Sequence, residues 1–522
     1  MIEEYLVIGV AIALIMLAGR GLARWAGIPQ AIPLVLLGVA ASLVPGMSKA
    51  VVAPEVVLNV YLPLLVYRAA FLTAPREAKE DAVPISVMAF GLTCVTALAV
   101  MLAVHLAVPR LGWPAALALG AAVSPTDPVA ATSIMQRLGA PRRLVTILEG
   151  ESLVNDAVAL TLFGLALTAL SKPVTAADGA VLLLRMVAGG VLYGLAVGWV
   201  MARLRLQIKD SGAQIVISLI TPFIAYLPAE HFGLSGVLAT ITTGFYLGTR
   251  AQGLLPPASR LTGTAFWDIL VFLLESSLFV LLGLKIRQVM TDVSDYSVVS
   301  LIWTALVVVA VITLLRLLWT MAVFPLAKWL PGRHLSFDRI ARAERLVMGW
   351  AGMRGAITLA VALSLPLTVP NRPLLIFLAA VVVLTTLLGQ GTTLAPLLRR
   401  LGLGESEKSV VEEATARKAT MEAALARLDQ LNADGKVDDH KADVFRQVLE
   451  LRLNTVRQLL GDEDGSETPG DTGTRGLRKQ LIRAQREKLD ELYSSGEIGA
   501  ETQRRLLHEL DLEDRRRASG PH

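Results

Sequence analysis

Acidic and apolar residues meet abruptly in residues 149–170, which read EGESLVNDAVALTLFGLALTAL. In a helix, Ser152 and Asp156 lie four residues apart, as do Glu151 and Asn155, so the four side chains form one polar stripe. The apolar run that follows Asp156 is typical of a helix inside a lipid bilayer. Acids on an intramembrane face are very costly unless protons, cations or an arginine compensate their charge. The segment therefore predicts a membrane helix with a functional polar face.

The same apolar character extends over most of the chain. Of its 522 residues, 54% are hydrophobic and only 18% are charged, and the mean hydropathy of +0.58 excludes an ordinary soluble protein. Up to about Leu398 the sequence consists of long apolar runs, each close to the roughly 20 residues that cross a bilayer as a helix. We expect an all-α polytopic membrane protein with about thirteen transmembrane helices. They are expected near residues 5–24, 31–46, 52–74, 82–108, 113–136, 143–171, 179–203, 212–228, 231–249, 262–289, 298–327, 343–366 and 372–398.

Basic residues are distributed unevenly among the loops between these spans. One set of alternate loops holds most of the arginines and lysines, and such loops stay in the cytoplasm. The C-terminus is therefore expected on the cytoplasmic side of the cell inner (plasma) membrane, and the N-terminus outside. The first span has no basic leader and no cleavage site after it, which predicts a retained helix.

Charge and cysteine content exclude several other classes of function. The formal charge of +5 is what positive-inside loops produce, so we expect no nucleic-acid partner. The single cysteine, Cys94, excludes an intrachain disulfide and a cysteine-ligated metal. We expect no cofactor.

The composition becomes charged and polar after about residue 403. We expect two domains, a transmembrane domain over residues 1–402 and a cytoplasmic helical domain over residues 403–522. The second contains a duplication, because residues 428–431 (LDQL) recur as residues 489–492 (LDEL), each followed by a glycine four residues later. Each copy predicts a helical hairpin. The hairpins are expected either to regulate the membrane domain or only to pack and dimerise beneath it.

The order of the spans predicts an internal symmetry. Thirteen spans divide into two sets of six and a linker span, and the odd offset of seven turns the second set upside down, as in an inverted repeat. The fifth span then corresponds to the twelfth, and both contain helix-breaking sequences, residues 124–128 (SPTDP) and residues 352–355 (GMRG). We therefore expect two broken helices that cross.

The breaks place polar groups at mid-membrane depth. Pro125 and Pro128 cannot donate backbone hydrogen bonds, which frees carbonyl oxygens that are good ligands for a hard cation. Asp127 beside them favours a polar cavity over a plain proline kink. Asp127 is expected to balance the positive N-terminal ends of the broken helices, and Arg354 the negative C-terminal ends. We also expect Arg354 to pair with Glu151; the alternative is an arginine at the cytoplasmic edge that extends to water.

At these residues the chain resembles the monovalent cation/proton antiporters of the NhaP type and their eukaryotic sodium/proton exchanger relatives. The resemblance covers roughly residues 1–400. It rests on three motifs in order: the threonine-aspartate-proline unit at Thr126, Asp127 and Pro128, the acidic-serine and asparagine-aspartate signature at Glu151, Ser152, Asn155 and Asp156, and the glycine-rich arginine motif at residues 352–355.

The resemblance implies a mechanism and an assembly. It implies a homodimer in which a core bundle, holding spans five, six, twelve and thirteen, moves against a dimerisation bundle. It also implies that Asp156, Ser152 and the backbone of Thr126 ligate the transported cation. Asn155, in place of a second aspartate, resembles the electroneutral branch of the family.

The chain departs from the family pattern at two positions. Arg68 stands where relatives often carry an acid, and Glu275 stands where an asparagine is common. A pair between Arg68 and Glu275 would explain both departures. Cation preference therefore does not carry over from the resemblance.

Competition for one carboxylate explains how such a site would exchange ions. A carboxylate in a partly dehydrated cavity binds a proton more readily than in water, and a nearby cation opposes this, so the two compete. We expect antiport of Na⁺, and of K⁺ or Li⁺ as alternatives, for H⁺ by alternating access at Asp156. The cation- and proton-binding set is expected to comprise Asp156, Asp127, Ser152, Thr126, Asn155 and Glu151.

Two other classes of function compete with this interpretation. Residues 233–236 (GLSG) match the Gly-x-Ser-Gly of rhomboid intramembrane serine proteases, but every histidine after Ser235 lies in a loop or the tail, so the serine lacks a base. Close helix packing by small residues explains this motif better. A channel or an anion transporter is the second alternative. Proton-coupled, cation-dependent flux in vesicles distinguishes all three.

Overall fold

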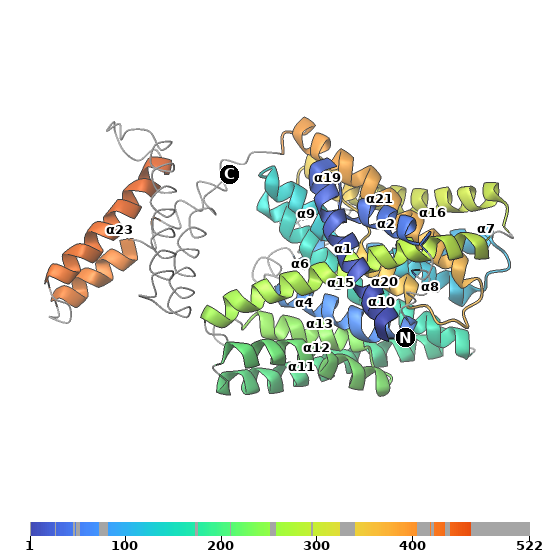
Figure 1. Cartoon of the computed structure of the whole chain (residues 1–522), viewed down its shortest axis with the longest axis horizontal. Helices are drawn as coiled ribbons and strands as arrows, with labels where there is room; N and C mark the ends of the chain where they lie inside the picture. The colour runs from blue at the N-terminus through green and yellow to red at the C-terminus, as the bar shows by residue number, and fades with distance from the viewer. Residues whose placement is uncertain are drawn as a thin grey trace. The chain divides into compact units, whose positions relative to one another are not determined.

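The computed structural model of the chain describes residues 2–26, 28–44, 47, 53–72, 82–172, 176–208, 210–250, 257–293, 296–323, 340–403, 418, 422–433 and 439–460. Over these residues the structure consists of helices, turns and loops, with no strand. Figure 1 shows the membrane helices gathered together, with α11, α12 and α13 side by side. The all-α prediction is confirmed.

Nine helices in the described part of the chain are long and apolar enough to cross a membrane. Seven are α1 (Ile2–Ala26), α10 (Arg142–Ser171), α11 (Ala176–Gln207), α12 (Ser211–His231), α15 (Pro257–Asp292), α21 (Arg372–Arg400), and α16 (Val298–Leu318) with its extension η4 (Trp319–Val323). Two are composite, α3 (Pro54–Val56), η2 (Val57–Tyr61) and α4 (Leu62–Leu72), and α6 (Ala82–Ser86), η3 (Val87–Leu92) and α7 (Thr93–Ala107). Two shorter apolar helices are α2 (Ala31–Ala41) and α13 (Gly236–Gly248). The exact number of membrane crossings stays a prediction.

The two predicted breaks are present. The fifth span is interrupted between α8 (Trp113–Val123) and α9 (Pro128–Arg137), and the twelfth between α19 (Arg342–Trp350) and α20 (Ala356–Leu363). Pro128 occupies the first position of α9, where a missing backbone N–H is tolerated. At each break one helix therefore ends and a second helix begins after a short non-helical segment.

The membrane helices form two bundles. The first contains α1, α2, α4, α11, α12, α13 and α15, and the second contains α7, α8, α9, α10, α16, α19, α20 and α21. They meet where α10 contacts α11 and α13, and where α15 contacts α20 and α21. Both broken helices belong to the second bundle.

Equivalent contacts recur in the two halves of the chain. An offset of seven spans relates α2 to α13 and α4 to α15, and α2 packs on α15 just as α13 packs on α4. In the same way, α8 and α9 both pack on α10, and their counterparts α19 and α20 both pack on α21. These matching contacts support the inverted repeat.

The chain divides into two compact units, Met1–Ser409 and Val410–His522. The second unit contains a helix over residues 422–433 and α23 (Asp439–Leu460). Arg446 of α23 bonds Asp429 of the preceding helix at 2.7 Å. The second copy of the predicted duplication lies outside the described residues, so the repeat stays a prediction.

Candidate functional site

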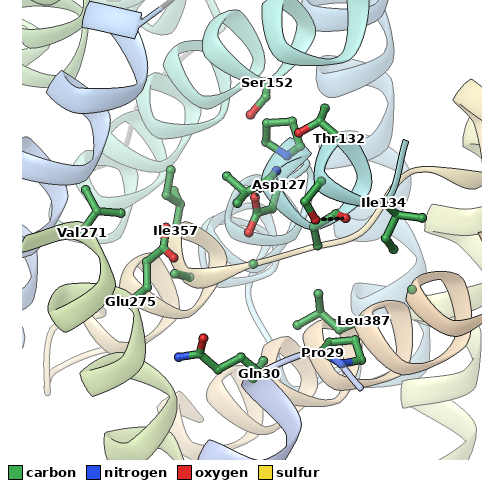
Figure 2. Close-up of a pocket in the computed structure, with 18 of the residues that line it drawn as sticks. Pro29, Gln30, Asp127, Thr132, Ile134, Ser152, Val271, Glu275, Ile357 and Leu387 are labelled. Atoms are coloured by element: carbon green, nitrogen blue, oxygen red, sulfur yellow. Dashed lines mark hydrogen bonds between the residues drawn. The ribbon is translucent and has the colours of Figure 1, made fainter. Parts of the chain in front are cut away.

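A cavity of about 1480 Å³ lies among α9, α10, α15, α20 and α21. Figure 2 shows Asp127, Ser152 and Glu275 among the residues around it. Four predicted site residues line this cavity: Thr126, Asp127, Ser152 and Asp156. The other three, Glu151, Asn155 and Arg354, are buried but do not line it.

The two breaks cross at Asp127. Its backbone N–H donates to the carbonyl of Met353 at 2.8 Å, and its side chain accepts from the backbone N–H of Val129 at 2.9 Å, which caps the N-terminus of α9. Gly355, where α20 begins, lies so close that a Cβ there would be 1.7 Å from Asp127 Oδ2. Asp127 thus lies at the positive N-terminal ends of two half-helices, as predicted.

Arg354 lies at the opposite, negative helix ends. Its Nε donates to the carbonyl of Val123 at 2.9 Å and its Nη2 to that of Ser124 at 3.2 Å, where α8 ends. Its Nη1 donates to the carbonyl of Gly352. These carbonyls have no further turn of helix to bond, and the arginine supplies their donors.

The predicted pair between Arg354 and Glu151 is wrong. Glu151 instead forms a two-pronged ion pair with Arg316 of α16, in which Nη2 lies 2.8 Å from Oε2 and Nη1 donates to Oε1. The side chains are 2% and 1% exposed. The pairing differs from the prediction because the broken helix ends occupy the guanidinium of Arg354. Sequence reasoning overlooked Arg316, although a lone arginine in an apolar span is a sufficient signal.

Polar side chains of α10 form hydrogen bonds with Thr126, which lies in the first break. Ser152 Oγ donates to the carbonyl of Thr126 at 2.8 Å, and Asn155 Nδ2 donates to Thr126 Oγ1 at 2.9 Å. Thr126 Oγ1 in turn lies 3.4 Å from Glu151 Oε1. Glu151 and Asn155 therefore position the loop that lines the cavity.

Asp156 differs from its neighbours in having no donor. Its side chain is 3% exposed and lines the cavity, and no hydrogen bond or ion pair joins it to another residue of the described chain. Asp127, in the first break, lines the same cavity as Asp156. A buried carboxylate in this position is available to a proton or a cation.

The two departures from the family pattern do not compensate each other. Arg68 Nη2 bonds Asp268 Oδ1 at 2.7 Å, so the expected pair between Arg68 and Glu275 is wrong. Asp268 lies seven residues before Glu275 on α15, about two turns away. Glu275 lines the cavity instead.

Ser235, the nucleophile of the protease alternative, has a structural role. It is buried and caps α13, where its Oγ accepts from the backbone N–H of Leu238 at 3.3 Å. A Cβ at Gly190 of α11 would lie 2.7 Å from the carbonyl of Ser235. Small residues therefore bring these helices close together.

Comparison with known proteins identifies the family. The sequence pattern of the transmembrane part of sodium/hydrogen exchangers matches residues 10–400. The chain is 31% identical to an uncharacterized Na⁺/H⁺ exchanger, YjcE, of Escherichia coli (strain K12) over 489 residues, which cover 88% of each chain. It is 28% identical to a sodium, potassium, lithium and rubidium/H⁺ antiporter of Bacillus pumilus (strain SAFR-032), over 93% of this chain and 74% of that protein.

A solved structure shares the fold. The sodium proton antiporter MjNhaP1 from Methanocaldococcus jannaschii superposes with a TM-score of 0.62 at 19% sequence identity. The match covers 77% of this chain and 99% of that one.

Proposed function

The chain belongs to the family of transmembrane sodium/hydrogen exchangers and exchanges sodium ions for protons across a membrane, and we propose that Asp156 is the carboxylate that holds the two in turn. One observation carries this proposal. Asp156 is a buried acid that lines a large cavity and has no hydrogen-bond donor among the described residues. Proton and cation compete for such a group, because each neutralises a charge that the surroundings leave uncompensated.

The cation-binding atoms are proposed to come from α10 and from the first break. Asp156 and Ser152 supply side-chain oxygens and Thr126 its backbone carbonyl, which already lies 2.8 Å from Ser152 Oγ. Asp127 lies beside them and balances the helix N-termini. Glu151 and Asn155 support Thr126 and do not bind the ion directly, and Arg354 compensates the opposite helix ends.

Transport is proposed to proceed by alternating access. The breaks, Asp127 and Asp156 all lie in the second bundle, so movement of that bundle against the first would carry the site as a unit. Arg20, Arg24, Arg137 and Arg399 line the cavity. By the positive-inside rule we propose that the side of the membrane with these arginines, and with it the C-terminus, is the cytoplasmic side of the cell inner membrane.

Stoichiometry, cation range and assembly are also proposals. Asn155 leaves fewer titrating charges than a second aspartate, which favours electroneutral exchange of one cation for one proton. The name of the Bacillus relative supports testing K⁺ and Li⁺ beside Na⁺. We propose a homodimer joined through the first bundle, with a role in pH homeostasis.

Replacement of Asp156 tests the proposal. In liposomes that enclose a pH-sensitive dye, Asp156→Asn is expected to abolish exchange for every monovalent cation, because the amide keeps the shape but cannot release a proton. Wild-type exchange is expected to fall at acid pH, where protons saturate Asp156, and higher cation concentration should move this limit to lower pH.

Asp127→Asn is the matched control. It keeps the oxygen that caps α9 and should retain part of the activity. Near wild-type dissipation of a pH gradient by Asp156→Asn vesicles on addition of sodium or potassium would show that another carboxylate carries the proton.

A further inference from the structure

Glu275 introduces an additional acid into the cavity. It lies on α15, and Figure 2 shows it extending toward the space beside Asp127. Asp127, Asp156 and Glu275 line the same cavity. Like charges so placed favour binding of a compensating cation or proton.

The polar neighbours of Glu275 on its own helix all have partners. Asp268 bonds Arg68 at 2.7 Å, Ser276 accepts from Gln30 Nε2 at 3.0 Å, and Ser277 Oγ lies 3.1 Å from the hydroxyl of Tyr61. In the described chain, no hydrogen bond or ion pair connects Glu275 to a protein group. Its carboxylate is therefore free to meet an ion in the cavity.

The route to Asp156 from the arginine-rich face is unfavourable for a cation. Five arginines line the cavity, namely Arg20, Arg24, Arg68, Arg137 and Arg399. The acid of Asp268 is already engaged by Arg68. Glu275 thus adds negative charge to the cavity that these arginines line.

Glu275 and Asp156 belong to different bundles. α15 packs on α1, α2, α4 and α12 and also meets α20 and α21 of the second bundle, whereas Asp156 lies on α10, which packs on α8 and α9. Within the described residues, no three histidines, cysteines or acids are close enough to hold one metal ion together. The proposed movement of one bundle against the other would therefore change the distance between Glu275 and Asp156.

We propose that Glu275 is an entry site for the transported cation, which draws the ion past the arginines and passes it to Asp156 only when the cavity is open to the arginine-rich face. This inference rests on the proposed function. It predicts an asymmetry that Asp156 alone would not produce, because Asp156, Ser152 and Thr126 move together while Glu275 stays with the first bundle.

Side-resolved kinetics of Glu275→Gln test the proposal. With purified protein in liposomes and a sidedness assay, the apparent KM for Na⁺ on the arginine-rich face should rise about tenfold, the effect expected of one charge interaction in a partly hydrated cavity. The KM on the opposite face should stay within about twofold of wild type. An unchanged KM on both faces, or an equal rise on both, would overturn the proposal.

Two further variants separate charge from shape. Glu275→Asp keeps the charge and should restore most of the affinity. Asp292→Asn removes an exposed acid from the end of the same helix, outside the cavity, and should leave both KM values unchanged.

A chemical readout covers the case in which Glu275→Gln does not fold. In a Cys94→Ala background, Glu275→Cys should react with a charged thiol reagent from the arginine-rich face only. An anionic adduct should lower the KM for Na⁺ and a cationic adduct should raise it. Reaction from both faces, or equal effects of both adducts, would contradict the proposal. A different result would contradict the proposed function itself, namely an Asp156→Asn variant that still exchanges cations for protons.

Discussion

Among the described residues, Arg316 and Glu151 form the most deeply buried ion pair, and through Thr126 the pair supports the proposed transport site. Both prongs of the guanidinium contact the carboxylate, and Glu151 also lies 3.4 Å from the hydroxyl of Thr126. The pair therefore fixes the loop whose carbonyl is offered to the cation. Loss of one partner from such a pair leaves an uncompensated charge, at a cost of about 3–5 kcal/mol.

Arg316→Ala is expected to reduce the amount of folded protein and its melting temperature. The reason is the unpaired carboxylate of Glu151, so Arg316→Ala combined with Glu151→Gln should recover part of the yield. Size-exclusion chromatography of detergent extracts and thermal unfolding measure both.

Arg354→Ala is the matched control for this rescue. Arg354 bonds carbonyls and not Glu151, so adding Glu151→Gln should not help it. The assignment of partners is wrong if Glu151→Gln rescues Arg354→Ala and leaves Arg316→Ala unimproved.

At the residue scale, the sequence identified the acids but not their partners. Spacing within one helix shows which side chains share a face, which is why Ser152, Asn155 and Asp156 could be grouped. A partner 165 residues away, as Arg316 is from Glu151, depends on how helices pack, and no local pattern contains that information. Both arginine pairings predicted from the sequence were wrong for this reason.

The two broken helices each complete the other. α8 ends on donors from Arg354, which belongs to the second break, while α9 and α20 both begin beside Asp127, which belongs to the first. The backbone bond from Asp127 to Met353 joins them directly. Neither break has its polar groups satisfied alone.

Gly355→Ala is expected to damage this crossing. Its Cβ would lie 1.7 Å from Asp127 Oδ2, so Asp127 must move, at a cost of about 1–3 kcal/mol, and exchange should fall at least about tenfold. Liposome flux and melting temperature give the two readouts.

Gly389→Ala provides the comparison, because a Cβ there meets no atom within 4 Å. It should leave exchange unchanged. Wild-type activity in Gly355→Ala would mean that the close approach to Asp127 has no role in transport.

At the element scale, the breaks were predictable and the π-helical stretches were not. Pro125 and Pro128 cannot donate backbone hydrogen bonds, and Gly352 and Gly355 weaken a helix by their conformational freedom, so both breaks fall where the sequence favours an interruption. The stretches η2, η3 and η4 are mostly apolar and contain no proline, so no residue within them distinguishes them from an ordinary α-helix.

The whole molecule combines a membrane unit, which contains all the proposed site residues, with a C-terminal unit. The division falls between Ser409 and Val410. No motif of the transport site lies beyond this point, and the last membrane helix, α21, ends at Arg400.

Removal of the chain from Gly404 onward is therefore expected to leave exchange intact and to shift its pH response or maximal rate. The liposome assay over a series of pH values measures this, with surface labelling to show correct insertion. A correctly inserted truncation without any transport would refute the boundary.

The long-range pairs around the breaks also have a consequence for biosynthesis. The ribosome completes Glu151 165 residues before Arg316, and Ser124 230 residues before Arg354. At about 5–20 residues per second, the first interval lasts about 8–33 s. During this time the nascent chain already contains Glu151 and the first break, but the arginines that stabilise them have not been translated. We therefore expect the first half of the protein to be exposed to membrane chaperones and proteases during this interval, and the yield of folded carrier to depend on the speed of translation.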